Sequence, residues 1–319
     1  MKKVIISGAT GFIGSRLVRL LLKSNIEVLA LGKRDRKDIN PLRFPEDPRL
    51  TYLKLDMAEI SNLPEYLKAI GWDPTDSVFY HFAWGGKNGL SDLVVEDQYQ
   101  NVIWSINAFI TADQMKCSKF IHVGTMEEAF VKPYLDLDYH KEKHYNRHVV
   151  YALAKKAARD YLKSISNQFN IDLIIVTKSH VIGPNDSRDS FLLVVVQKII
   201  NGEKIEMTSG EQRFDAISVT DCVKAFKVIG EMGSKNSEYW IGSGNPRTLR
   251  EYIEIIANLY PPKYAIEFGK IAYSDVKLDK KVFSPKLLNN ELNFRCNQTF
   301  ESAIGELYRW LKFREIYEE

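Results

Sequence analysis

Short apolar runs recur along the first part of the chain and alternate with stretches whose apolar positions follow helical spacing. The runs predicted to be strands are residues 4–6, 26–31, 50–55, 77–83, 120–125 and 171–177. Short runs bounded by turn residues are typical of strands buried in a parallel sheet. Residues 15–23, 97–115 and 151–165 place apolar side chains three and four positions apart, which predicts helices with one buried face. The alternation predicts an α/β fold with a doubly wound parallel sheet, in which ligands bind at the carboxyl ends of the strands.

The alternation ends after Lys178, and the remaining chain follows a different pattern that closes with an amphipathic helix at residues 299–311. We expect residues 1–178 to form the sheet domain. Residues 179–319 are expected to form a smaller α/β domain that closes over the edge of the sheet and builds a second pocket. Residues 216–244, which end in a short strand-like run, are expected to return to the first domain.

Three glycines, Gly8, Gly11 and Gly14, lie between the first predicted strand and the first predicted helix. A strand, a glycine turn and a helix in this order form a phosphate site, because backbone N–H groups and the positive end of the helix dipole point at one place. Without Cβ atoms in the way, a pyrophosphate can approach the main chain. We therefore predict a dinucleotide cofactor here, rather than a purely structural turn. The predicted contacts are Gly8, Thr10, Gly11, Phe12, Ile13 and Gly14.

The end of the second predicted strand bears on the choice of cofactor. NAD sites commonly place an Asp or Glu there to hold the ribose 2′-hydroxyl, but this strand ends in Gly32, Lys33 and Arg34. A carboxylate would repel a 2′-phosphate, whereas two cations attract it. The sequence therefore favours NADP(H). NAD(H) is the alternative, because Asp35 follows and both cations also suit a solvated surface.

Two further strand ends supply candidate cofactor contacts. The third strand closes before Asp56 and Met57, where a carboxylate can accept a hydrogen bond from an adenine amino group. The fourth ends in Phe82 and Ala83 and is followed by Trp84 and two glycines. Glycines at the carboxyl end of a strand indicate close passage of the backbone by a ligand. We expect all five residues to contact the cofactor.

Tyr151 and Lys155 are candidate catalytic residues, because a spacing of four places them one above the other on a helix. An ammonium near a phenol favours the phenolate, which makes tyrosine a usable acid or base near neutral pH. Thr125 closes the preceding predicted strand, and its hydroxyl can bind the same substrate oxygen. A hydroxyl and a phenol on one oxygen beside a nicotinamide suit hydride transfer to or from a carbonyl or alcohol.

Other tyrosines also have a lysine four positions later. These pairs are Tyr139/Lys143, Tyr273/Lys277 and Tyr308/Lys312. Only Tyr151 opens a predicted helix after a strand that ends in a hydroxyl, whereas Tyr139 lies in a charged segment at residues 132–147. We therefore predict that Tyr151 acts in the reaction, with Tyr139 as its rival.

These motifs together resemble the extended short-chain dehydrogenase/reductase family, specifically its nucleotide-sugar enzymes. The resemblance rests on GATGFIG from Gly8, on Thr125 and on YALAK from Tyr151 to Lys155, and it spans nearly the whole chain. It implies a Rossmann sheet with a C-terminal nucleotide-sugar domain. It also implies that Thr125 and Tyr151 bind the sugar oxygen, that Tyr151 exchanges the proton, and that Lys155 holds the nicotinamide ribose.

The order of the family's motifs implies further site residues. Asn101 and Lys178 fall among the cofactor contacts. The substrate contacts that the resemblance implies are Trp84, Thr125, Met126, Glu127, His180 and Arg213. It also implies a homodimer, in which the helices predicted at residues 97–115 and 151–165 pair with their symmetry mates.

The residues after Thr125 bear on the type of reaction. Dehydrating members of the family often have Asp and Glu there as acid and base, whereas this chain has Met126 and Glu127, followed by Glu128. A thioether transfers no proton. We therefore expect NADP(H)-dependent reduction at C4 of a nucleotide-linked 4-keto (deoxy)sugar, as used in polysaccharide biosynthesis. The alternative is a nucleotide-sugar epimerase or 4,6-dehydratase with tightly bound NAD. Glu127 and Glu128 suit either a solvated surface or the pocket.

Composition narrows the classes of partner and the compartment. The 44 Lys and Arg nearly balance the 41 Asp and Glu, and the net charge of +3 comes without the basic stripe that nucleic acid requires. No apolar run approaches the roughly 18 residues that cross a bilayer, and the early glycines argue against a secretion signal. Cys117, Cys222 and Cys296 are odd in number and far apart, which indicates free thiols in a reducing cytoplasm.

Three histidines recur every four residues, at His140, His144 and His148. This spacing can present metal ligands on one face of a helix. Their charged neighbours favour a solvated surface instead, and we predict no metal site.

Overall fold

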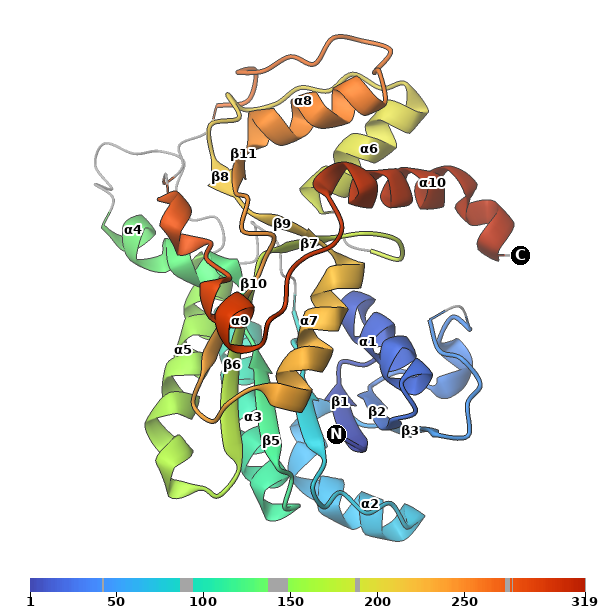
Figure 1. Ribbon diagram of the computed structural model, residues 1–319, viewed down its shortest axis with the longest axis vertical. Helices are drawn as coiled ribbons and strands as arrows, with labels where there is room; N and C mark the ends of the chain where they lie inside the picture. Colours follow the sequence, from blue (N-terminus) through green and yellow to red (C-terminus); the bar gives the residue numbers. More distant parts are fainter. Residues whose placement is uncertain are drawn as a thin grey trace.

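A seven-stranded parallel sheet forms the centre of the protein (Figure 1). The computed structural model describes residues 1–41, 43–86, 94–136, 149–186, 190–272, 276 and 278–318, the side chains of 149 and 314–318 excepted. The strands are β1 (Lys3–Ser7), β2 (Glu27–Gly32), β3 (Leu50–Lys54), β4 (Val78–His81), β5 (Lys119–Val123), β6 (Asp172–Lys178) and β10 (Glu238–Ile241). Their order across the sheet is β3-β2-β1-β4-β5-β6-β10. The prediction of a doubly wound parallel sheet is confirmed, and all six predicted strands belong to it.

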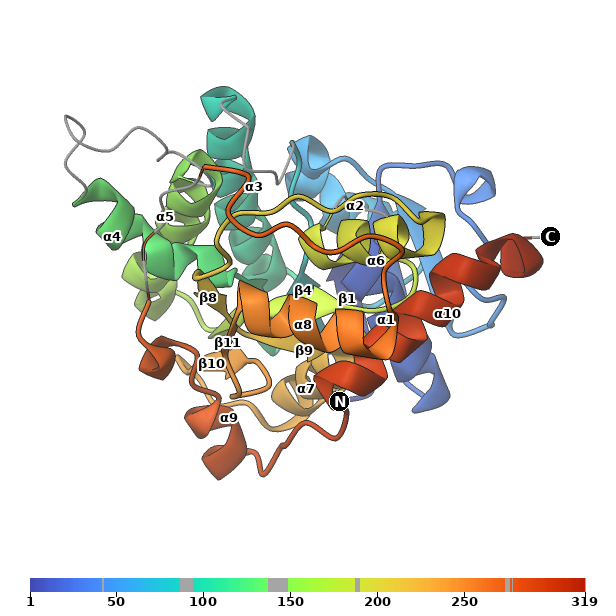
Figure 2. The ribbon, with the colours of Figure 1, turned by 90° about the horizontal axis from the view of Figure 1, so that it is seen from above.

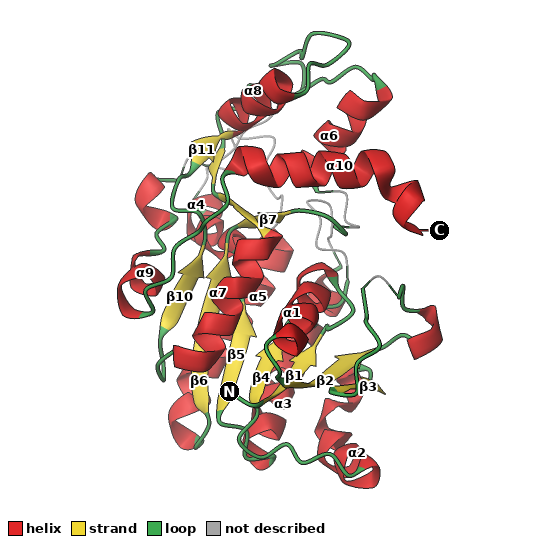
Figure 3. Cartoon of the chain, turned by 45° about the vertical axis from the view of Figure 1, so that its right-hand side comes forward, coloured by secondary structure: helices red, strands yellow, loops and turns green. Residues whose placement is uncertain are grey.

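Helices cover both faces of the sheet. Their bounds are α1 (Phe12–Lys23), α2 (Leu63–Ile70), α3 (Val95–Gln114), α5 (Val149–Ile165) and α7 (Val219–Met232). α1 and α7 pack together on one face, whereas α2, α3 and α5 cover the other. Figure 3 shows α1 and α7 in front of the strands.

The alternation of side chains along β1 explains why both faces need helices. Val4 and Ile6 pack on the face covered by α1 and α7, whereas Ile5 packs on the opposite face, and all three are fully buried. Phe226 of α7 and Phe109 of α3 are equally buried, one on each face. Burying a side chain of this size stabilises the fold by about 1.5–3 kcal/mol. A sheet covered on one face alone would leave half of these residues in water.

The C-terminal part of the chain has its own apolar cluster beyond the carboxyl ends of the strands (Figures 1 and 2). Its helices are α6 (Phe191–Asn201), α8 (Leu249–Leu259) and α10 (Phe300–Glu318). They enclose a core that includes Val196, Ile253 and Ile304. Two small sheets lie beside it, formed by β7 (His180–Ile182) with β9 (Ala216–Ser218) in parallel and by β8 (Arg213–Phe214) with β11 (Arg247–Thr248) in antiparallel pairing.

β10 brings the chain back to the central sheet, where it pairs in parallel with β6. A buried carboxylate, Asp215, lies where the chain passes between the two parts. Its oxygens accept hydrogen bonds from Ser179 Oγ at 2.8 Å and from Ser243, and Trp240 Nε1 donates to Ser179 Oγ at 2.8 Å. Hydrogen bonds to a charged group contribute about 1.5–3 kcal/mol each. This network joins three separate crossings of the chain at one point.

The remaining helical segments are short. They are η1 (Arg36–Asp38), η2 (Met57–Asn62), η3 (Met126–Phe130), α4 (Val131–Leu135), η4 (Ser166–Gln168), η5 (Lys280–Val282) and α9 (Lys286–Glu291). No helix in the described part of the chain is both long and apolar enough to cross a membrane. His140, His144 and His148 lie outside the described residues.

Candidate active site

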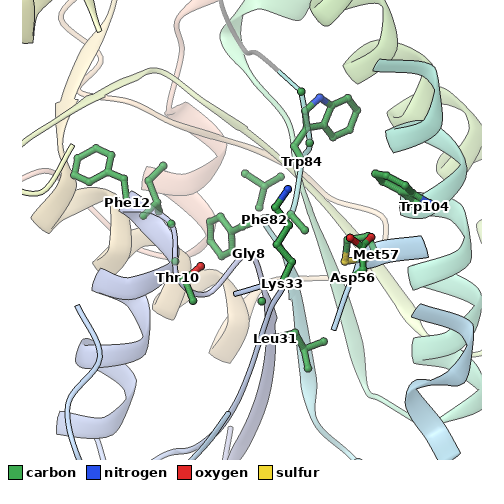
Figure 4. A pocket seen from close by; sticks show the side chains of 18 of the residues that line it. Gly8, Thr10, Phe12, Leu31, Lys33, Asp56, Met57, Phe82, Trp84 and Trp104 are labelled. Carbon is green, nitrogen blue, oxygen red and sulfur yellow. The ribbon is translucent and has the colours of Figure 1, made fainter. Parts of the chain in front are cut away.

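A cavity of about 970 Å³ follows the carboxyl ends of the central strands (Figure 4). Six strands of the sheet contribute to it, through Gly8, Lys33, Leu55, Phe82, Gly124 and Lys178. The carboxyl ends of parallel strands meet at one edge of the sheet, and residues far apart in the sequence therefore share this cavity. Every residue that the sequence predicts to contact the cofactor lines it, with the exception of Asn101.

The glycine turn needs two of its glycines for steric reasons. Gly8 has a φ of +68°, and a Cβ there would lie 2.8 Å from the amide nitrogen of Ala83. A Cβ on Gly14 would overlap the carbonyl oxygen of Gly8. These close approaches seat the start of α1 against the ends of β1 and β4, and a side chain at either position would force the turn open.

The N-terminus of α1 fits the pyrophosphate of a dinucleotide. Gly11 is the N-cap residue, is exposed and has no side chain with which to cap the helix, and the first turn holds no acidic residue. The helix therefore presents backbone N–H groups and the positive end of its dipole to the cavity, without a competing carboxylate in its first turn.

Three cationic side chains, Lys33, Arg34 and Arg43, line the cavity beside the end of β2. Arg43 donates hydrogen bonds to the carbonyl oxygens of Thr10 at 3.3 Å and of Asn185 at 2.8 Å, which joins the glycine turn to the loop after β7. Burial, and then the charge of Arg34, lower the pKa of Arg43. An anion bound between these cations would relieve their repulsion. Arg43 was not predicted, because its irregular loop carries no periodic signal.

Gly32 ends β2 in a crowded place. A Cβ there would lie 3.0 Å from the hydroxyl of Tyr52 and 3.1 Å from Cγ2 of Thr10. The Tyr52 hydroxyl also lies within hydrogen-bond distance of the carbonyl oxygens of Gly32, at 2.9 Å, and Arg34, at 2.6 Å. An Asp at position 32, the residue type that suits NAD, would therefore require Tyr52 and Thr10 to move.

Asp56, Met57 and Trp104 line another part of the cavity, on the opposite side of Figure 4 from Phe12. Asp56 accepts a hydrogen bond from the backbone of η2 at 3.0 Å. Met57 and Trp104 offer the apolar and aromatic surface that a planar base requires. Trp104 was not predicted to contact the cofactor, although the helical spacing of its segment would have allowed that prediction. Gln100 and Trp104 are four residues apart on α3, and both line the cavity.

Tyr151 and Lys155, in the first turns of α5, both line the cavity and are 9 % and 5 % exposed. Nζ of Lys155 donates to the carbonyl oxygen of Val123 at 2.9 Å and lies 3.7 Å from the centroid of the Trp84 ring. The Tyr151 ring meets the same indole edge-on, with 6.1 Å between centroids. The predicted tyrosine and lysine therefore share one aromatic neighbour.

Burial lowers the pKa of Lys155 to about 7, with Glu128 opposing the shift and Lys178 adding to it. His81 and His122, on neighbouring strands of the sheet, are also buried, and their rings stack at 6.1 Å. Burial, and then the charge of Lys155, lower the pKa of His81 to about 3 and that of His122 well below its usual value. Both histidines are therefore neutral near pH 7, and neither competes with the lysine as a cation.

Trp84 and the glycines after it are held from α3. Nε1 of Trp84 donates to the side-chain oxygen of Gln98 at 2.8 Å. The Asn101 side chain accepts from the amide of Gly85 at 2.6 Å and donates to the carbonyl oxygens of Gly85 at 3.2 Å and Asp97 at 2.7 Å. Asn101 thus lies behind the cavity wall and fixes the loop that lines it.

Thr125 lies next to the cavity wall formed by Gly124, but it is not itself part of that wall. It is 5 % exposed and is the N-cap of η3, where its Oγ1 accepts a hydrogen bond from the amide of Glu127 at 3.4 Å. Met126 is 8 % exposed and packs in an apolar cluster with Phe130 and Phe283. The position after Thr125 is therefore an apolar contact with no proton to transfer. Glu127 is partly exposed.

The substrate contacts predicted in the C-terminal part lie in two places. His180 begins β7 and packs edge-on against Phe214, with 5.8 Å between ring centroids. Arg213 lines a second cavity of about 350 Å³, together with Glu211 and Arg250. Two guanidinium groups in one small cavity suit an anionic group of a ligand.

Tyr308, one of the tyrosines with a lysine four positions later, lies away from both cavities. Tyr308 on α10 stacks on Tyr260 at 3.8 Å between centroids, against the C-terminal apolar cluster, and neither Tyr308 nor Lys312 lines either cavity. The other rival pairs, Tyr139/Lys143 and Tyr273/Lys277, lie outside the described residues.

Over nearly its whole length, the chain is similar to known proteins. The chain is 25 % identical over 315 residues to CDP-abequose synthase of Salmonella typhimurium, covering 97 % of this chain and 98 % of that protein. It is 24 % identical over 319 residues to dTDP-4-dehydro-6-deoxyglucose reductase of Escherichia coli, covering 97 % of each. In fold it is similar to dTDP-glucose 4,6-dehydratase of Bacillus anthracis in complex with NAD, with a TM-score of 0.79, 20 % identity, and 99 % and 98 % of the two chains covered.

A family model gives the most direct assignment. The model described as the NAD dependent epimerase/dehydratase family matches residues 4–242. That match runs from β1 to the end of β10 and covers more than half of the chain. The chain therefore belongs to the NAD dependent epimerase/dehydratase family, the nucleotide-sugar group of the extended short-chain dehydrogenases/reductases.

Proposed function

We propose that the protein reduces a nucleotide-linked 4-keto sugar at C4 with NADPH. The observation that carries this proposal is a single cavity lined by Lys33, Arg34 and Arg43 beside β2 and by Tyr151 and Lys155 on α5. When bound, NADPH supplies the hydride. The similarity over nearly the whole chain to a protein named dTDP-4-dehydro-6-deoxyglucose reductase supports reduction of a 4-keto sugar.

Tyr151 is the proposed proton donor in this reaction. The phenol would donate its proton to the carbonyl oxygen as the electron pair of the C=O π bond moves onto that oxygen, while the bound cofactor would supply the hydride to carbon. The Lys155 ammonium stabilises the phenolate that remains, and solvent returns the proton. The Thr125 hydroxyl is proposed to bind the same oxygen. The products are the C4 alcohol and the oxidised cofactor.

Cofactor choice follows from the charges beside β2. Lys33, Arg34 and Arg43 are proposed to bind the 2′-phosphate of NADP(H), and the crowding at Gly32 disfavours the carboxylate that suits NAD. Arg213, in the second cavity, is proposed to contact a phosphate of the nucleotide sugar.

An epimerase or 4,6-dehydratase that retains NAD is the second candidate. The likeness in fold to a dTDP-glucose 4,6-dehydratase in complex with NAD supports it, and Glu127 keeps one carboxylate close to Thr125. The buried thioether of Met126 favours reduction, because a dehydration needs both an acid and a base near the sugar. The two candidates differ in net cofactor use, since a retained NAD is regenerated in each turnover.

Cofactor consumption tests the proposal. Purified protein is incubated with NADPH and either dTDP-4-dehydro-6-deoxyglucose or its CDP-linked counterpart, and NADPH absorbance and the NMR spectrum of the sugar are followed. One NADPH oxidised for each C4 alcohol formed supports reduction. Conversion of dTDP-glucose or UDP-glucose without added cofactor, and with no NADPH consumed in the keto-sugar reactions, would show that the second candidate is right.

We also propose a homodimer that pairs α3 and α5 with their symmetry mates. Tyr99 and Ile103 on α3 are 57 % and 39 % exposed, and Leu153 and Tyr161 on α5 are 38 % and 52 % exposed. The two helices pack side by side, and spacings of four and eight residues place each pair on one helix face. A second copy related by a two-fold axis would bury these four side chains in a four-helix bundle.

A further inference from the structure

Glu128 is a buried carboxylate directly behind Thr125. Its side chain is 3 % exposed, Oε1 accepts a hydrogen bond from the amide of Thr125 at 2.8 Å, and Oε2 pairs with Nη1 of Arg159 at 3.2 Å. A Cβ on Gly124 would overlap Oε1. The chain therefore leaves space for this carboxylate through a glycine and supplies partners for both of its oxygens.

Arg159 connects this carboxylate to the edge of the central sheet. It lies one helical turn after Lys155 on α5, and its Nη2 donates to Glu238 of β10, which also pairs with Lys163. The guanidinium is thereby held between two carboxylates. Glu128 itself is held by the amide of Thr125, the N-cap of η3, and by Arg159 of α5.

A buried ion pair of this kind needs a reason beyond stability. Removing two charges from water costs several kcal/mol, and well-packed apolar residues of similar volume often stabilise a fold equally well. The position of Glu128 offers a reason. One of its oxygens fixes the main chain of Thr125, and its negative charge acts on Lys155.

We propose that Glu128 is a positioning residue for the reaction, which holds Thr125 in place and supplies a buried negative charge that favours the ammonium form of Lys155. Arg159 orients the carboxylate. This inference rests on the proposed function for its choice of substrate, whereas the hold on Thr125 stands on the contacts of Glu128 alone.

Several titratable and charged groups surround Lys155. They are Tyr151 and Arg159 on α5, Lys178 on β6, His81 on β4, His122 on β5 and Glu128 on η3. Burial and the charge of Lys178 lower the pKa of Lys155, whereas the charge of Glu128 raises it and so favours the ammonium. Removing the carboxylate charge is therefore expected to deprotonate Lys155 at lower pH.

Two variants separate the hydrogen bond from the charge. Glu128→Gln keeps an oxygen that accepts from the Thr125 amide but removes the charge, whereas Glu128→Ala removes both. Glu238→Gln is the matched control, because it also takes a carboxylate from Arg159 but leaves Glu128 in place. For each protein, kcat and KM for NADPH-dependent reduction of dTDP-4-dehydro-6-deoxyglucose are measured against pH. The Kd of NADPH is measured over the same pH range by fluorescence.

In Glu128→Gln, the pH above which kcat falls is expected to move down by about one unit, with kcat at low pH near that of the wild type. In Glu128→Ala, the same shift is expected together with a fall in kcat of about 10–100-fold, because Thr125 is displaced. Glu238→Gln is expected to show neither effect. A lowered melting temperature in the Glu128 variants, with unchanged kcat and pH profile, would make the role purely structural and overturn the proposal.

The binding measurement keeps this inference separate from the proposed function. If the wild type reduces no keto sugar in the panel, the proposed function fails, but the pH dependence of NADPH binding still reports on Lys155. A downward shift of its midpoint in Glu128→Gln and not in Glu238→Gln supports the inference. Equal midpoints in all three proteins contradict it. If Glu128→Ala fails to fold, the nearly isosteric Glu128→Gln decides alone.

Discussion

The ammonium of Lys155 lies 3.7 Å from the centroid of the Trp84 ring, and this contact joins the end of β4 to the candidate catalytic helix. The indole is itself fixed, because its Nε1 donates to Gln98 at 2.8 Å. A cation over the face of an indole is stabilised by the quadrupole of the ring. Trp84 therefore favours the charged lysine in a place where burial disfavours it.

Replacing this ring tests the contact. Trp84→Leu removes the aromatic face and is expected to lower kcat by about 2–30-fold, which corresponds to the usual range for a cation–π contact. Trp84→Phe keeps a ring over Lys155 and is expected to retain most of the rate. Steady-state kinetics at saturating NADPH compare the two. If both variants lose the same activity, the loss comes from the cavity's shape and the cation–π argument is wrong.

Tyr151→Phe tests the proton donor. The ring and its edge-on contact with Trp84 remain, but the phenol proton is lost. General acid–base catalysis contributes about 10²–10⁴-fold, and kcat is expected to fall by that factor with NADPH affinity intact. Tyr139→Phe is the control with the same tyrosine–lysine spacing and is expected to leave the rate nearly unchanged. Loss of turnover in Tyr139→Phe alone would move the active residue to the segment before α5.

Cofactor preference depends on the cations beside β2. Lys33→Ala combined with Arg34→Ala is expected to weaken NADPH binding at least about tenfold, because each removes a charge-assisted contact to the 2′-phosphate. NADH binding is expected to change little. Lys37→Ala is the matched control, since Lys37 is exposed and does not line the cavity. Fluorescence titrations measure the Kd of both cofactors for each variant. If the affinities for NADPH and NADH fall equally, the proposed preference for NADP(H) is wrong.

The homodimer prediction concerns the exposed faces of α3 and α5. Ile103→Asp combined with Tyr161→Asp would bury unpaired carboxylates in the proposed bundle and is expected to give a monomer. The matched control is Ile70→Asp on α2, where an isoleucine of similar exposure lies on another helix. Light scattering at micromolar concentration measures the mass. A wild-type monomer under the same conditions contradicts the prediction.

The fold was readable because buried parallel strands appear as short apolar runs, and their alternation with helices leaves few topologies. Strand ends were less certain. The run at residues 120–125 predicted a strand up to Thr125, whereas β5 ends at Val123 and Thr125 caps the next helix. Glu128 completes this cap by accepting a hydrogen bond from the amide of Thr125. A polar contact of this kind does not appear in the pattern of apolar residues from which the strand was predicted. The sequence near β10 does not indicate which strand it pairs with, since its partner β6 lies far away in the chain.

Cavity residues were predictable where they follow a strand directly, because the fold class places every strand end at one edge. Arg43 lies in an irregular loop, and only the folded chain brings it to Thr10 and Asn185. Glu127 and Glu128 are indistinguishable as a pair in the sequence. Their different burial depends on Arg159, which comes from another element.

Lys155→Met is expected to stabilise the protein without cofactor while removing its activity, and the gain should depend on pH. Burial lowers the pKa of Lys155 to about 7 in the folded protein, below the ordinary lysine value of 10.5. Between these values the unfolded chain binds a proton that the folded chain does not, and wild-type stability therefore rises with pH. Well below pH 7, both states carry the charge, and the folded state bears its full burial cost.

The measurement is urea unfolding of wild type and Lys155→Met between pH 7.5 and pH 10, values chosen as about the span over which the lysine titrates. The stability advantage of the methionine variant is expected to shrink by about 1 kcal/mol per pH unit across this range, since one pKa unit corresponds to about 1.4 kcal/mol. The lost hydrogen bond to Val123 lowers the variant's stability equally at every pH, and it therefore does not affect the slope. A difference that stays constant with pH would mean that Lys155 titrates as an ordinary lysine. In that case neither Trp84 nor Glu128 would be needed to keep it charged.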